Sequence, residues 1–159
     1  MSFAGSDLSN LVEQMTANLR DSSKGQPIGA ACDIAREFLE RFFRFGLALE
    51  REPELRDTPA VKRFLDGASG LLPGVMPGFF SAVDRFDGRL HMPGDLDWRQ
   101  VGKFRSSLEF FTAYFGQSPE FELEDVDAAI RERAQYDGGI SAESIPHGIP
   151  KSHWWWFAP

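Results

Sequence analysis

The sequence predicts an all-α protein, a single domain of five to six helices packed around a central helix at about residues 28–52. Three observations lead to this prediction: apolar residues recur at helical spacing in several segments, no segment alternates as a half-buried strand does, and no internal repeat is present. A chain of 159 residues has room for one domain, 1–159, with a core that needs neither metals nor disulfides. Residues 140–159 contain three prolines and no helical period, so we expect an extended tail that packs on the domain.

The central helix carries the strongest pattern. Eight apolar residues fall within about half of the helix circumference: Ile34, Ala35, Phe38, Leu39, Phe42, Phe43, Phe45 and Leu49. An apolar face this wide, with four phenylalanines, requires two or three neighbouring elements. On the opposite face, Glu37 precedes Arg41 and Glu40 precedes Arg44 by one turn, the favourable order for ion pairs, which indicates a solvent face. Gly46 lies on the apolar face, where it either allows close approach by another helix or weakens this one.

Three further helices are predicted from the same spacing. Residues 7–20 place leucines, a valine and a methionine on one stripe, and this helix should pack on the central one. Residues 98–115 repeat large apolar side chains at helical intervals behind Asp97, a suitable N-cap. A last helix is predicted over residues 123–135, ended by the two glycines at 138 and 139.

The segment between residues 58 and 97 is the least regular. Thr58 followed by Pro59 is a helix-start signal. The glycines and prolines of residues 67–78 predict a break, followed by a short helix through residues 79–86. Residues 86–97 have the composition of a turn-rich loop that could contain a short strand at Arg89 to Met92.

The charge balance limits the partners. Lys and Arg total 17 against 24 Asp and Glu, which gives a net charge of −7 and repels phosphate backbones and anionic lipids. We therefore expect neither a nucleic-acid nor a membrane partner. A single cysteine, Cys32, cannot form an internal disulfide and is expected to be a buried small apolar residue. No leader pattern and no window approaching about 18 apolar residues is present, so we expect a cytoplasmic protein.

Acidic residues gather in two places and suggest a basic partner. One group is Asp95 and Asp97; the other consists of Glu120, Glu122, Glu124, Asp125 and Asp127. Acids in the first turn of a helix also stabilise the helix itself, which explains part of the second group. Small size, negative charge and the lack of a catalytic motif together favour a protein-binding module, an immunity- or antitoxin-type inhibitor that neutralises a basic toxin or nuclease.

The end of the chain, IPHGIPKSHWWWFAP, is the most unusual local composition. Three large indole rings in a row need cover from water. If the tail straps across the helices, Trp154 and Trp156 face inward and Trp155 lies over a proline or an arginine. The alternative is an aromatic patch that binds a partner, or that docks on a second copy in a homo-oligomeric structural protein.

A helical enzyme is the competing hypothesis, with a site near His91, His147 and His153. Three imidazoles could hold a metal ion, but no HExxH, no cysteine pair and no acid at ligand spacing accompanies them, so neither a metal nor another cofactor is predicted. The enzyme hypothesis requires the three histidines to converge on one pocket together with an arginine or an acid.

Arg85, five residues and His91 form a spacing that is similar to the arginine–histidine signature of HEPN-type ribonucleases. The sequence departs from that signature at Phe86, where a polar residue is usual, and at the Asp87-Gly88 pair, which favours a turn. The resemblance covers seven residues. It implies an all-helical ribonuclease in which the arginine and the histidine act on the RNA phosphate and 2′-hydroxyl.

Overall fold

The computed structural model describes residues 5–22, 24–115 and 123–158, and in these ranges every regular element is helical. The elements are α1 (Gly5–Ser22), α2 (Ile28–Arg51), η1 (Pro53–Asp57), α3 (Pro59–His91), α4 (Trp98–Phe115), α5 (Glu124–Asp137), η2 (Ala142–Ser144) and η3 (Trp154–Trp156). The predicted all-α class is confirmed. No helix in the described ranges combines the length and the apolarity that crossing a membrane requires.

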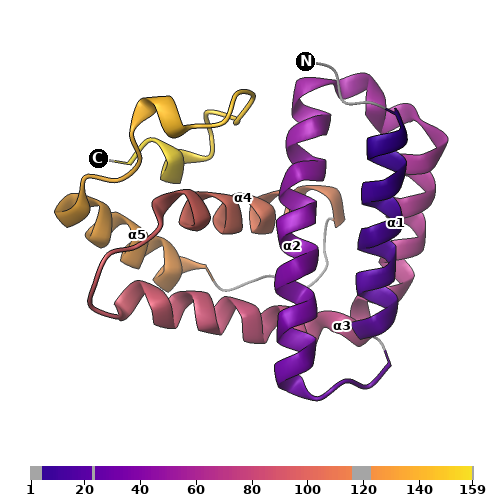
Figure 1. Cartoon of the computed structure of the whole chain (residues 1–159), viewed down its shortest axis with the longest axis horizontal. Helices are drawn as coiled ribbons and strands as arrows, with labels where there is room; N and C mark the ends of the chain where they lie inside the picture. The colour runs from indigo at the N-terminus through magenta and orange to yellow at the C-terminus, as the bar shows by residue number, and fades with distance from the viewer. Residues whose placement is uncertain (1–4, 23, 116–122, 159) are drawn as a thin grey trace.

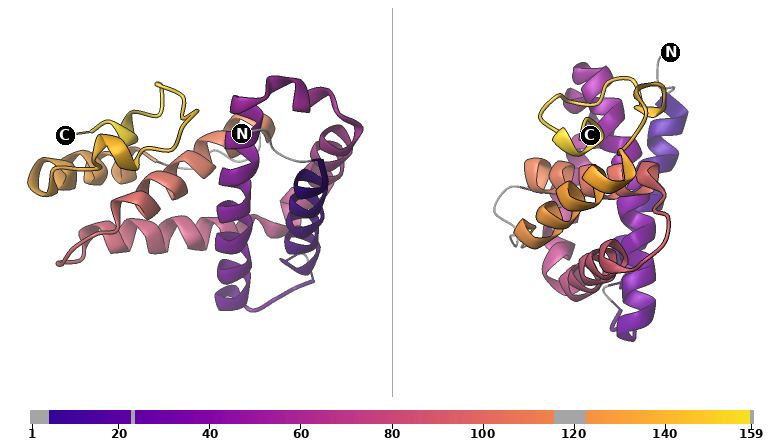
Figure 2. Two further views of the ribbon diagram at one scale, coloured as in Figure 1. Left: turned by 45° about the horizontal axis from the view of Figure 1, so that its top comes forward. Right: turned by 90° about the vertical axis from the view of Figure 1, so that its left-hand side faces the viewer.

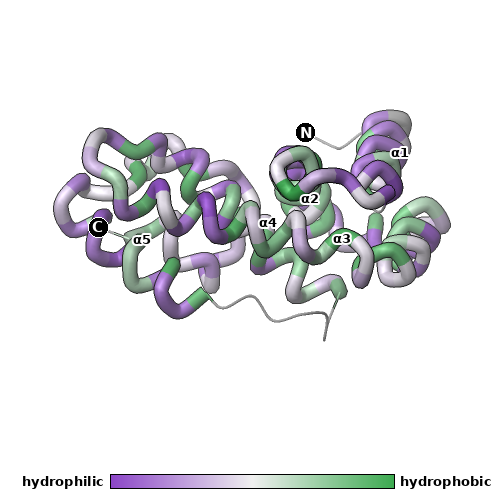
Figure 3. Tube along the Cα trace, turned by 90° about the horizontal axis from the view of Figure 1, so that it is seen from below, coloured by the Kyte–Doolittle hydropathy of each residue, from purple (hydrophilic) through white to green (hydrophobic). Residues whose placement is uncertain are grey.

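Helix α2 is the packing centre, as predicted. It contacts α1, α3, α4 and η1, and it stands between α1 on one side and the arm formed by α4, α5 and the tail on the other (Figure 1). Its phenylalanines meet those of α3 and α4: the ring centroids of Phe38 and Phe79 are 5.4 Å apart, and those of Phe42 and Phe111 are 6.0 Å apart. The tube coloured by hydropathy shows apolar segments where these helices meet (Figure 3).

Several details of α2 follow the sequence. A Cβ atom placed on Gly46 would overlap the ring of Phe110, so this glycine allows α4 to approach closely. Cys32 is fully buried, as expected. The ion pair between Glu37 and Arg41 forms at 2.6 Å, whereas no pair between Glu40 and Arg44 is found in the described part of the chain.

Helix α3 corrects the prediction of a break at residues 67–78. The helix continues through Pro73 and Pro77 to His91, and Figures 1 and 2 show it descending beside α1 and then bending to run beneath α4 and α5. A proline inside a helix removes one backbone hydrogen bond and bends the helix. The helix can continue past the proline when tertiary packing stabilises both sides of the bend. Around the two prolines of α3 five residues are buried, and their packing stabilises the bent helix: Leu72, Val75, Met76, Gly78 and Phe79.

The predicted loop after residue 86, with its optional strand at Arg89 to Met92, is also wrong. Helix α3 extends to His91 because Phe86 and Leu90, one turn apart, are both buried on the same face. The cost of one helical glycine, about 1 kcal/mol, is smaller than the gain from burying two large apolar side chains.

The predicted start of α4 and the predicted glycine stop after α5 are confirmed by their caps. The carboxylate of Asp97 accepts a hydrogen bond from the backbone N–H of Gln100 at 3.3 Å and so caps the start of α4. Gly138 follows α5 in the left-handed conformation, with φ of 83°, and its N–H donates to the carbonyl of Ala134 at 2.8 Å.

The tail packs on the helices, as predicted, but in a different conformation. Residues 154–156 form a 3-10 turn against α4, with Trp155 and Trp156 buried and Trp154 partly exposed. Successive residues of a 3-10 turn point about 120° apart, so the alternation of an extended strand, which would have placed Trp154 and Trp156 inward, does not apply.

Candidate functional site

A cavity of about 540 Å³ lies where α2, α3 and α4 meet. The second half of α3 runs below α4, and both helices contact α2 (Figure 1). The loop that joins α3 to α4, residues 92–97, contributes Met92 and Leu96 to its wall. Cavities of this size are in the range that proteins use for small organic ligands.

The floor of the cavity is apolar. Its side chains include Ala82, Phe86, Leu90, Val101 and Phe104. The rings of Phe86 and Phe104 stack with centroids 4.4 Å apart, which joins α3 to α4 beneath the opening. An apolar floor of this kind favours a ligand with an apolar body.

Charged side chains surround that floor. Four are cationic: Arg36 from α2, Arg85 and Arg89 from α3, and Lys103 from α4. Three are acidic: Glu37, Glu40 and Asp97. The cavity is therefore lined by more cations than acids, in a protein whose net charge is −7.

The wall formed by the α3–α4 loop is held in place by Arg133 of α5. Its guanidinium donates to the carbonyls of Leu90, Met92 and Gly94 at 3.1, 2.7 and 2.6 Å. These contacts satisfy carbonyls at the C-terminal end of α3, where a cation is also favoured by the helix dipole. The loop is thus fixed to α5 by one side chain.

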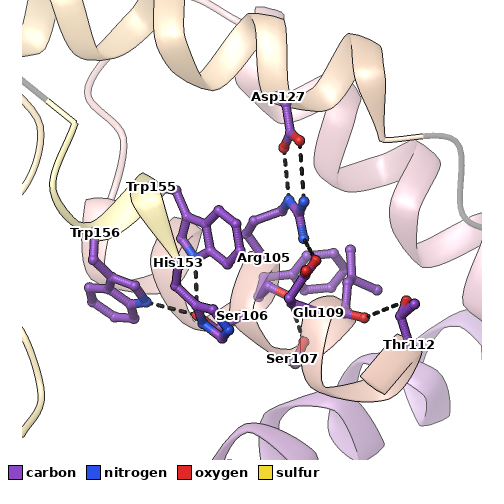
Figure 4. A network of polar contacts seen from close by, with 11 residues as sticks. Arg105, Ser106, Ser107, Glu109, Thr112, Asp127, His153, Trp155 and Trp156 are labelled. Carbon is purple, nitrogen blue, oxygen red and sulfur yellow. Dashed lines mark hydrogen bonds and ion pairs between the residues drawn. The ribbon is translucent and has the colours of Figure 1, made fainter. Parts of the chain in front are cut away.

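A second polar cluster connects α4 to the tail (Figure 4). The Ser106 hydroxyl oxygen accepts hydrogen bonds from the indole N–H groups of Trp155 and Trp156 at 2.9 and 2.8 Å, and it lies 2.8 Å from Nδ1 of His153. A hydroxyl has two lone pairs and one hydrogen, so the two indoles use both lone pairs and the hydrogen goes to His153. All four side chains are buried.

The serine–histidine contact in this cluster does not have the properties of a catalytic pair. The lone pairs of Ser106 that a nucleophile would use are occupied by the two indoles, and the side chain is fully buried. Burial also lowers the pKa of His153 to about 4, an effect that Glu109 opposes and Arg105 reinforces, so this imidazole is neutral near pH 7. The cluster therefore fixes the tail.

Arg105 lies beside this cluster and is 5% exposed. Its guanidinium donates to both carboxylate oxygens of Asp127 at 2.7 and 3.2 Å and to Glu109 at 3.1 Å (Figure 4). It also lies 4.2 Å from the ring centroid of Trp155. Arg105 thus connects α4 with α5 and the tail, and Asp127 is engaged inside the protein.

The three histidines of the enzyme hypothesis do not come together. His153 is buried beside Ser106, whereas His91 is exposed at the end of α3, 3.3 Å from Asp87, and His147 is exposed in the tail, where its carbonyl accepts from Arg51. Among the described residues no group of three His, Cys, Asp or Glu side chains is placed to hold a metal ion.

Arg85 and His91, which carry the resemblance to HEPN-type ribonucleases, lie on one continuous helix. Six residues of α-helix separate them by about 9 Å along the axis and about 120° around it. Arg85 pairs with Asp33 of α2 at 3.4 Å, while His91 lies beside Asp87. The two side chains are therefore not presented together to one phosphate group.

The two predicted acidic groups lie at opposite ends of α5. Glu124 and Asp125 are exposed at its start. Asp95 and Asp97 belong to the loop that Arg133 holds near the end of α5. Arg133 follows Glu124 by nine residues, so about 14 Å of helix axis lies between the start of α5 and the side chain that holds this loop. Glu120 and Glu122, which the sequence analysis placed in the same group as Glu124 and Asp125, lie outside the described residues.

The tryptophans proposed to bind a partner mostly pack within the chain. Trp155 and Trp156 are 2% and 0% exposed, so neither offers a surface to a partner or a second copy. Trp154 is partly exposed, with the guanidinium of Arg131 4.1 Å from its ring centroid. The interpretation of the tail as a strap agrees with these contacts.

Sequence reasoning did not find the cavity. Arg36 falls on the polar face of the central helix, which its charge pattern indicates is a solvent face, and neither Arg89 nor Lys103 belongs to a recognised motif. One local signal was available: Arg85 and Arg89 are like charges one helical turn apart, an unfavourable arrangement. This spacing has no meaning in a loop, which is what the composition of residues 86–97 predicts.

The chain was compared with protein-family models, curated proteins and solved structures, and none of the three comparisons gives a match.

Proposed function

We propose that the protein binds a small molecule with an apolar body in the cavity between α2, α3 and α4. The observation that carries this proposal is the cavity itself: about 540 Å³, with a stacked Phe86–Phe104 floor and charged side chains at the opening. Small-molecule sites are typically hollows of about 300 to 1,000 Å³ with apolar linings and a few polar groups. The proposal concerns binding, and no catalytic step is included in it.

The test uses two glycines of α3. A Cβ on Gly88, which lines the cavity, meets no atom within 4 Å, and the same holds for Gly67, which does not line it. Gly88→Phe should place an aromatic ring at the edge of the cavity, and Gly67→Phe is the matched control. Binding is followed by the fluorescence of phenylnaphthylamine, a neutral dye that emits in apolar sites. We expect Gly88→Phe to weaken binding about tenfold or more, since a ring that occupies the site removes most of the buried apolar contact.

The control must also behave as expected. Gly67→Phe should bind the dye as the wild type does, and both variants should fold, because replacing an exposed helical glycine raises helix propensity. Equal binding by Gly88→Phe and the wild type, or no binding by the wild type, would overturn the proposal.

A basic protein partner is the second candidate, in the manner of an immunity-type inhibitor. It is supported by the net charge of −7 and by the exposed Glu124 and Asp125, which form no ion pair in the described part of the chain. Such charges accelerate encounter with a cationic surface.

Purification from the native organism tests this second candidate. A stoichiometric basic partner should be released by salt and bound more weakly by the double variant Glu124→Gln, Asp125→Asn. Asp57→Asn, Asp66→Asn removes two exposed acids elsewhere and is the control. A partner that binds both double variants equally would contradict the assigned surface.

A further inference from the structure

We infer that the ligand of the α2–α3–α4 cavity is an anion, whose acidic group lies at the opening against Arg36, Arg89 and Lys103. This inference rests on the proposed function and adds the charge of the ligand. It starts from the contrast between the cavity, which is lined by four cations and three acids, and a chain with seven more acids than cations.

Two neighbouring arginines of α3, Arg85 and Arg89, are placed unfavourably when no anion lies beside them. Arg85 and Arg89 lie one turn apart on α3, and like charges at this spacing repel. Arg85 forms an ion pair with Asp33 at 3.4 Å, but in the described part of the chain Arg89 forms no ion pair. An anion between the helices would relieve this repulsion.

The acids at the opening are largely engaged elsewhere. Glu37 pairs with Arg41 at 2.6 Å, and Asp97 caps α4 through the N–H of Gln100. Glu40 forms no ion pair among the described residues. In the same ranges Arg36, Lys103 and Arg89 form no ion pair either. The cavity lining therefore includes three unpaired cations and one unpaired acid, Glu40.

The floor and the opening together define the chemical class. A guanidinium binds carboxylate, sulfonate or phosphate groups through two parallel N–H donors, and an ammonium binds them as a point charge. The apolar floor, made by Phe86, Leu90 and Phe104, accepts a ring or a short acyl chain. The ligand is therefore an amphipathic anion of small size, with its acidic group outermost.

Two dyes with the same aromatic body test the charge. Anilinonaphthalene sulfonate carries a sulfonate on the naphthalene ring, and phenylnaphthylamine lacks it. We expect the wild type to bind the sulfonate about tenfold more tightly, the effect of two ion pairs at a partly exposed site. The triple variant Arg36→Gln, Arg89→Gln, Lys103→Gln should remove this difference and leave the binding of the neutral dye unchanged.

The control for total charge is Arg44→Gln, Lys62→Gln, Arg63→Gln, which removes three exposed cations that do not line the cavity. It should retain the preference for the sulfonate. If the wild type binds both dyes equally, or if the control variant loses the preference as fully as the cavity variant does, the inference is wrong while the proposed small-molecule site stands. If the wild type does not bind the neutral dye, the proposed site fails and this inference fails with it.

Discussion

Ser106 donates its hydroxyl hydrogen to Nδ1 of His153 across 2.8 Å, which fixes this imidazole as the neutral tautomer with its hydrogen on Nε2. The relationship follows from the two indole N–H groups that occupy the lone pairs of the hydroxyl. A protonated His153 would carry a hydrogen on Nδ1 and would have no acceptor in Ser106. The attachment of the tail is therefore coupled to the charge of one histidine.

Acid should weaken the fold through His153. Its pKa is lowered to about 4 in the folded protein, mainly by burial, from an ordinary value of 6.5. Between these values the unfolded chain binds more protons, so the free energy of unfolding falls as the pH is lowered from 6.5 to about 4. The loss amounts to about 3 kcal/mol, and denaturant titrations at several pH values measure it.

The comparison for this pH effect is His153→Asn, whose amide oxygen can accept from Ser106 without titrating. The difference in stability between wild type and this variant should change across the same pH window. Parallel profiles for wild type and His153→Asn would refute the assignment.

Replacing Ser106 by alanine should destabilise the protein by about 2 to 6 kcal/mol. The change leaves the indole N–H groups of Trp155 and Trp156 buried without an acceptor, and each unsatisfied donor costs about 1 to 3 kcal/mol. The neighbouring Ser107 is equally buried, but in the described ranges its hydroxyl bonds only to the carbonyl of Phe104, at 2.6 Å, so Ser107→Ala should cost less than about 1 kcal/mol. Denaturant unfolding followed by tryptophan fluorescence compares the two.

The carboxylates that meet Arg105 should differ in importance. Asp127 is 17% exposed and holds the buried guanidinium with two hydrogen bonds, so Asp127→Asn should cost about 3 to 5 kcal/mol. The side chain of Glu109 is 47% exposed, and Glu109→Gln should cost less than about 1 kcal/mol. Both variants remove one negative charge, so equal thermal stabilities would contradict the assigned geometry.

The elements that could be predicted from the sequence are those whose pattern is local. The apolar face of α2 identified the packing centre, and Asp97 and Gly138 marked helix ends that the structure has. The predicted break at Pro73 and Pro77 is wrong because the burial of side chains on both sides of the prolines outweighs their low helix propensity.

The polar cluster and the cavity could not be predicted for a different reason. Ser106 and Ser107 are indistinguishable in the sequence, and the partners of Ser106 lie 47 to 50 residues away in the tail. Arg36 and Lys103 become neighbours of one cavity only when α3 bends and brings its second half beneath α4. Long-range placement of this kind depends on the packing of the whole chain.

The contact between α2 and α4 should depend on the absence of a side chain at Gly46. An added methyl group would overlap the ring of Phe110, which is buried and cannot move away freely, so Gly46→Ala should cost about 1 to 3 kcal/mol. Gly70 on α3 has open space around its Cβ position, and Gly70→Ala should instead stabilise the helix by up to about 1 kcal/mol. Thermal unfolding of the two variants gives opposite signs if α2 and α4 are in the contact described, and the same sign if they are not.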